Sequence, residues 1–254
     1  TVTVDNITIG GNISQDSGTV KLDGNYPTGT ANVALGNTTL DSLSGGGYNV
    51  GIGTQALTAN TSGDANVGVG YGALDANTSA SYNVGIGYDA LGVNTTGTAN
   101  VAVGGQSLDA NTTASNNTAV GYQALTANTT GAENTAIGKE AAKANTTGSY
   151  NTALGRTSFL TNTTGSSNVA LGANTLRSST TASNNTAVGY DSLRANTTGN
   201  SNVAVGTNSL DANTTGGANT AVGYQALTGN TTAADNTSVG YNSLVANTTG
   251  ASNT

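Results

Sequence analysis

The sequence of 254 residues contains no cysteine, histidine, methionine or tryptophan. Without cysteine there are no disulfide bonds and no thiol chemistry. Without histidine or cysteine, the chain lacks the commonest general base and the softest nucleophile and metal ligand of enzymes. Proline and phenylalanine occur once each, and aromatic residues make up only 4%. An ordinary globular core needs more large apolar side chains than this.

Charge is also scarce, at 7% of residues with a formal net charge of −7, so we do not expect nucleic-acid binding. No apolar run approaches the ~20 residues that a membrane-spanning helix needs. No signal peptide is visible and the first residue is Thr1, so we expect a processed chain or a fragment of a longer one.

Thr, Asn, Gly, Ala and Ser dominate, and they are organised as a repeat. Asn recurs every 17 residues without interruption from Asn32 to Asn253. Numbered from this Asn as position 1, the unit reads N-[VT]-[AG]-[VIL]-G-x-x-[AS]-L-x-A-N-T-T-G-x-x. A period this regular indicates a solenoid and argues against a disordered low-complexity chain.

The unit is too short for a helical pair, which takes about 33 residues. Its N-T-A-V-G segment alternates and is β-branched, as in a short strand, and N-T-T-G is typical of a turn. The sequence therefore predicts an all-β, single-chain β-solenoid of about 13 coils over residues 32–254. Coils spaced ~4.8 Å apart would form a rod of roughly 60 Å. Residues 1–31 precede the repeat as a non-repeat strand segment.

We expect the core to contain a column of the aliphatic residues at position 4, facing a column of the leucines at position 9. Position 9 is Ala142 in one coil and Phe159 in the next, which suggests volume compensation. The constant Asn at position 1 is either an inward amide ladder, which we favour, or a surface turn residue.

The segment N-T-A-V-G-Y-Q-A-L-T-A-N-T-T-G at Asn117–Gly131 resembles the tandem repeats of bacterial surface fibres and phage tail-fibre proteins. It is more loosely similar to the β-roll heads of trimeric autotransporter adhesins. The resemblance covers about Asn32 to Thr254 and implies a fibre architecture. The adhesin-head unit is shorter, so the trimeric state does not carry over with it.

The two ends of a solenoid expose strand edges. Residues 1–31 are expected to form a cap or a strand donated to a neighbouring subunit, with Thr1, Val2, Thr3, Val4, Ile7 and Ile9 at the joint. The chain stops at Thr254, two residues into another copy of the repeat. An open end of this kind predicts a head-to-tail filament.

Asn-x-Ser/Thr sequons recur at position 12, at Asn60, Asn77, Asn94, Asn111, Asn128, Asn145, Asn162, Asn196, Asn213, Asn230 and Asn247. Paired hydroxyls follow them, as at Thr95, Thr96, Thr112, Thr113, Thr129 and Thr130. These residues form either a turn with a ladder of hydroxyl groups, or a densely glycosylated edge with sugars attached to Asn or to Thr. Covalent glycans are the only non-protein groups expected, and no cofactor or metal is.

Tyr recurs at position 6, at Tyr71, Tyr88, Tyr122, Tyr190, Tyr224 and Tyr241. These tyrosines are either half-buried residues at the ends of strands, or an aromatic stripe that stacks on sugars or packs against another rod. Five of the six basic residues fall in consecutive coils, at Lys139, Lys143, Arg156, Arg177 and Arg194. They form either a solvated patch or an anionic contact site.

Asp41, Asp75 and Asp109 share position 10 on alternate coils, near the upper end of the ~5–9.5 Å separation of glycosidase carboxylates. No other group converges on them, so we do not expect an enzyme. The expected function is a structural subunit of an extracellular filament whose main partner is itself. The alternative is a trimeric phage tail-fibre shaft on a virion, or a bacterial adhesin, binding glycans or cell-surface receptors.

Overall fold

Positions 2 to 4 of each repeat form one short strand per coil in a computed structural model, which describes residues 30–254. The strands are β1 (Val33–Leu35), β2 (Val50–Ile52), β3 (Val67–Val69), β4 (Val84–Ile86), β5 (Val101–Val103), β6 (Thr118–Val120), β7 (Thr135–Ile137), β8 (Thr152–Leu154), β9 (Val169–Leu171), β10 (Thr186–Val188), β11 (Val203–Val205), β12 (Thr220–Val222) and β13 (Thr237–Val239). Residues 30–254 contain no helix.

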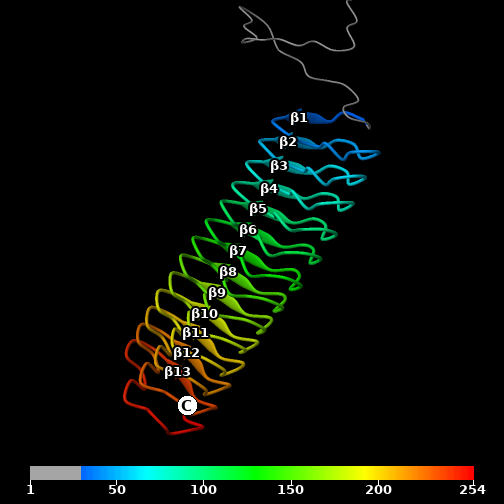
Figure 1. Ribbon diagram of the computed structural model, residues 1–254. Helices are drawn as coiled ribbons and strands as arrows, with labels where there is room; N and C mark the ends of the chain where they lie inside the picture. Colours follow the sequence, from blue (N-terminus) through cyan, green and yellow to red (C-terminus); the bar gives the residue numbers. More distant parts are fainter. Residues whose placement is uncertain (1–29) are drawn as a thin grey trace, which may run out of the picture.

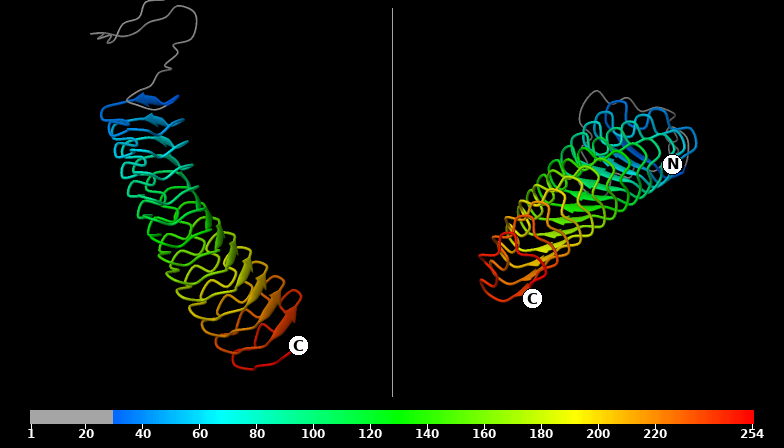
Figure 2. Two further views of the ribbon diagram at one scale, coloured as in Figure 1. Left: turned by 90° about the vertical axis from the view of Figure 1, so that its right-hand side faces the viewer. Right: turned by 90° about the horizontal axis from the view of Figure 1, so that it is seen from below.

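The thirteen strands form one parallel sheet in sequence order (Figure 1). Each residue pairs with the residue one repeat later, as in Val33 with Val50. This register holds along the sheet, because the repeat has no insertion. Figure 2 shows the coils stacked as an elongated rod with β1 and β13 at opposite ends. The predicted β-solenoid with 17 residues per coil is confirmed.

The prediction that position 4 faces the core is wrong. The small residues at position 3, such as Ala102 and Ala119, are fully buried, whereas Ile52 and Leu154 at position 4 are 38% and 44% exposed. The position 9 column does lie inside, where Leu108 and its equivalents are buried, except for the partly buried Leu244 in the last coil.

A steric reason explains which residue of the strand points inward. At Gly68, a Cβ atom would already lie 3.2 Å from Cγ of Leu57, a position 9 leucine. The gap between the strand and the leucine column therefore accepts at most a methyl group, and the larger aliphatic side chain of position 4 must point outward. Ala142 and Phe159 both lie in this buried core, as volume compensation requires.

The corners of the coil use an unusual backbone. Positions 7, 9 and 17 have positive φ although their residues are rarely glycine, as at Gln106 (57°), Leu108 (50°) and Asn116 (62°). Left-handed residues other than glycine carry strain, which the surrounding contacts must offset.

Candidate functional site

The asparagines at position 1 form the predicted inward ladder. Oδ1 of Asn117 accepts a hydrogen bond from the backbone N–H of Asn134 at 2.9 Å and one from its Nδ2 at 3.2 Å. Nδ2 of Asn117 donates to the carbonyl of Gly131 at 3.0 Å. Each buried amide thus satisfies the backbone of one coil and binds the next coil.

A second amide ladder runs along position 12. Nδ2 of Asn145 donates to Oδ1 of Asn128 at 2.9 Å and to the carbonyl of Gly148 at 2.9 Å. That carbonyl also accepts Nδ2 of Asn134 at 2.9 Å, so position 15 links the two ladders. The sequence indicated a turn here and gave no sign that the amide points inward.

This second ladder corrects the prediction of N-glycans at position 12. Every one of these candidate asparagines except Asn247, which lies in the last coil, is fully buried. An N-glycan is bonded to Nδ2, the atom that donates into the core, so the folded rod has no room for it at the buried positions. Three sequon asparagines outside the column, Asn37, Asn116 and Asn184, are exposed.

The two hydroxyl columns of the turn differ. Oγ1 of Thr95 donates to the carbonyl of Thr112 at 3.0 Å, and Thr112 and Thr129 repeat the pattern, so position 13 forms the expected hydroxyl ladder. The hydroxyls of position 14 lie at the surface, at Thr96, Thr113 and Thr130.

The position 12 ladder is interrupted at Ser179. Its Oγ is buried and has no hydrogen-bond partner among residues 30–254. On one side of the gap, Oδ1 of Asn162 accepts only the N–H of Gly165, and on the other, Nδ2 of Asn196 donates only to the carbonyl of Gly199. The short serine side chain leaves the two halves of the ladder unconnected.

We expect Ser179→Asn to stabilise the rod by about 2 kcal/mol, because three buried hydrogen bonds of ~1 kcal/mol each would form in an existing gap, less roughly 1 kcal/mol for fixing the longer side chain. Urea unfolding followed by circular dichroism measures the change. Ser201→Asn is the matched control, since position 17 is exposed and already holds Asn in other coils. An unchanged or lower stability of Ser179→Asn would contradict this account of the gap.

The outward face of the sheet, here called the strand face, consists of the side chains at positions 2 and 4. Position 4 is aliphatic in all thirteen strands, and position 2 is valine or threonine. Their exposure reaches 37% at Val203 and 67% at Val239. No charged residue occurs at either position. The face is therefore an uncharged band along the rod, with a continuous aliphatic column at position 4 beside a column of valine and threonine at position 2.

Tyrosines lie at both margins of the strand face. Position 6, which follows each strand, carries the exposed Tyr71, Tyr88, Tyr122, Tyr190, Tyr224 and Tyr241, and position 17, which precedes the next strand, carries the exposed Tyr48, Tyr82 and Tyr150. Rings on consecutive coils stack, with 5.5 Å between the centroids of Tyr71 and Tyr88. The position 6 rings are 43–75% exposed, so most of them are half-buried at the end of their strand, and both alternatives given for them stay open.

The protein-family models, the curated proteins and the solved structures contain no match to this chain. No helix within residues 30–254 has the length and apolarity that crossing a membrane requires.

The basic residues do not form one uniform patch. Arg194 makes a paired contact with Asp211, with distances of 2.9 Å from Nε and 3.2 Å from Nη2, and this contact raises the pKa of the guanidinium. Nζ of Lys143 lies 3.4 Å from Oε1 of Glu140. Both pairs are solvent-accessible and contribute little to stability.

The acidic residues of position 10 do not assemble a reactive site with other groups. Burial, and to a lesser extent the charge of Asp89, raise the pKa of Asp109. No group of three or more His, Cys, Asp or Glu residues within 30–254 is arranged to hold a metal ion.

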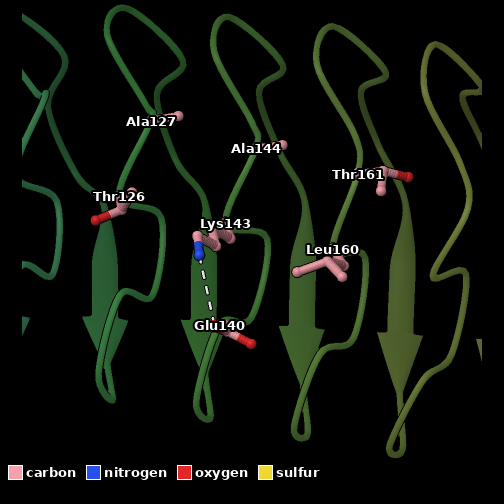
Figure 3. Close-up of a pocket in the computed structure, with 7 residues that line it drawn as sticks. All are labelled: Thr126, Ala127, Glu140, Lys143, Ala144, Leu160 and Thr161. Atoms are coloured by element: carbon pink, nitrogen blue, oxygen red, sulfur yellow. Dashed lines mark hydrogen bonds and ion pairs between the residues drawn. The ribbon is translucent and has the colours of Figure 1, made fainter.

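An open hollow of about 480 Å³ lies on the side of the coil formed by positions 7, 10 and 11 (Figure 3). Its lining consists of the Glu140–Lys143 pair and the small or apolar side chains around it, including Leu160. The lining also includes the hydroxyls of Thr126 and Thr161, and Glu140 supplies its one carboxylate.

Proposed function

We propose that the chain is a structural rod, the subunit of an extracellular filament that grows head to tail. The observation that carries the proposal is the unchanging parallel register, because the strand edge at one end of such a stack is complementary to the strand edge at the other end. Within residues 30–254, β1 pairs only with β2 and β13 only with β12. A rod with two matching open edges joins heterologously into an open filament.

The C-terminal edge provides a direct test. The N–H of Thr237 donates to Asn253 and that of Gly240 to Val222, so by alternation the N–H of Val239 points toward the end of the rod. Val239→Pro removes this donor, and we expect it to shorten filaments or abolish them in electron micrographs. Val239→Thr keeps the donor and serves as the control. Equal filament lengths in both variants would contradict an edge-to-edge joint.

The joint residues proposed from sequence, Thr1, Val2, Thr3, Val4, Ile7 and Ile9, lie outside the described residues. The hypothesis that they cap or complete a neighbouring subunit stays a prediction. If the segment is a donated strand, Ile7→Asp is expected to abolish filaments. If it is a cap, the same substitution would loosen the cap, and end-to-end association would increase.

Glycosylation belongs to the proposal in a narrower form, on the exposed hydroxyls of position 14. Such a coat would supply solubility to a chain in which only 7% of residues are charged. Attached sugars raise the intact mass above the 24.6 kDa of the polypeptide, which mass spectrometry measures on native material.

The second candidate is a trimeric fibre shaft or adhesin, favoured by the apolar strand face. Three rods could bury such a face around a common axis. A finite spike of three chains in electron micrographs would support this candidate over the filament.

A further inference from the structure

We propose that two copies of this chain pair side by side through their strand faces, with the rods parallel and the coils in register. The pairing goes beyond end-to-end growth and does not depend on it. Its occupant is a second copy of the same face.

The first support is composition. The face has an aliphatic residue at every position 4 and no charge at position 2 or 4, and exposed tyrosines flank it. The central part of a protein interface is depleted of charge and enriched in tyrosine in the same way. A band that extends along the whole stack is also larger than the scattered apolar side chains of ordinary surfaces.

The second support is area. Thirteen strands ~4.8 Å apart give a face about 58 Å long. Two side-chain columns ~7 Å apart cover a width of about 12 Å, which gives roughly 700 Å² per rod. Two such faces in contact bury about 1,400 Å², within the ~1,200–2,000 Å² of stable complexes.

The third support is the pairing of residues at the margins. A two-fold axis parallel to the rods, between the faces, places position 6 of each level against position 17 of the partner. At β7, Lys139 then faces the partner's Glu133, and the contact occurs twice. At β8, Arg156 faces the ring of the partner's Tyr150, a cation–π geometry. At β4, Tyr88 faces the partner's Tyr82.

The antiparallel arrangement brings like charges together at its centre. A two-fold axis perpendicular to the rods, at the central strand β7, places position 6 against position 6. Lys139 would then face the partner's Lys139, and like charges across an interface are unfavourable. The charge pattern therefore selects the parallel pair.

Sedimentation of the full chain tests the pairing. In the Val239→Pro background, where end-to-end growth is blocked, we expect a species of two 24.6 kDa chains. Adding Val103→Lys or Val188→Lys should weaken this pair about a hundredfold, because each pair would bury two charges. Thr113→Lys, at an exposed position outside the face, is the control and should leave the mass unchanged. Circular dichroism checks that each variant keeps its fold.

Charge reversal tests the register. Lys139→Glu alone and Glu133→Lys alone should each weaken the association of the two chains about tenfold, because each change places like charges against one another at two contacts. The double variant should recover the wild-type association. Failure of the double variant to recover would overturn the in-register arrangement.

The distance between spin labels at the same residue of the two chains reports the relative direction of the rods. The sequence has no cysteine, so one introduced cysteine per chain is labelled specifically. Ala65→Cys and Ser201→Cys lie near opposite ends, beside β3 and β11. In the parallel pair, both labels should lie about 20–25 Å from their equivalents on the partner. Antiparallel rods would separate them by about 40 Å, and rods joined only end to end by about 60 Å.

Three results would overturn the proposal: a monomer at high concentration, a mass of three chains, or label distances near 40 Å. A monomer would leave the strand face to a different partner. Loss of filaments in Val239→Pro with an intact side-by-side pair would show that the two contacts are separate.

Discussion

Replacing Gly104 by alanine is expected to destabilise the rod by about 4 kcal/mol. Gly104 occupies position 5 with φ of +128°, a conformation that residues with a Cβ rarely adopt. A Cβ there would lie 2.7 Å from both the backbone carbon and the oxygen of Gly121 in the next coil. Backbone cannot rotate away as a side chain would, so the two coils must separate.

The adjacent glycine provides the control. A Cβ on Gly105 would meet no atom closer than 3.7 Å, and that atom belongs to the ring of Tyr122. Gly105→Ala should change the stability by no more than about 0.5 kcal/mol. Thermal and urea unfolding measure both variants, and similar values for the two would refute the steric explanation of the constant glycine.

The variant Asn117→Ala is expected to cost about 3–5 kcal/mol, because it removes three buried hydrogen bonds and leaves one buried N–H without a partner. The N–H of Asn134 loses its acceptor at 2.9 Å, and the carbonyl of Gly131 loses one of its two donors, at 3.0 Å, and keeps Nδ2 of Asn128. Neither group can reach water, since both asparagines of this contact are buried. Amide hydrogen exchange should become faster at Asn134 than in the wild type.

Asn116→Ala is the matched control for this variant. Asn116 is exposed, and alanine already occupies the same position with positive φ at Ala65 and Ala99. We expect a change below about 1 kcal/mol. If the two variants were equally stable, the amide ladder would not be a main source of cohesion between coils.

The period of the repeat was enough to predict the solenoid, its 17-residue coils and the ladder at position 1. Each of these depends on identical residues meeting at identical places, which a sequence displays directly. The inward column at position 9 was predicted correctly for the same reason.

The prediction for position 4 conflicted with the ladder from the start. Residues one and four of an extended segment are an odd number apart, so they point to opposite faces. Once Asn117 is buried, Ala119 must be buried and Val120 must point outward. Hydrophobicity favoured the valine for the core, and only the alternation of the strand could have shown the error.

The inward turn of the position 12 amides had no comparable signal. It depends on the left-handed backbone at residues such as Leu125, with φ of 51°. A leucine in the sequence does not predict this conformation. Leucine there is held by burial in the core and by contacts of the coil as a whole. Such a corner is a property of the stack and cannot be deduced from one repeat.

The constant register makes length an adjustable property of this protein. Every coil meets its neighbours through the same parallel strand pairing, so duplication or loss of one coding repeat lengthens or shortens the rod by a single step of about 4.8 Å. Neither junction would contain a new kind of contact. Recombination between repeats could therefore produce a graded set of rods, each folded as well as its parent.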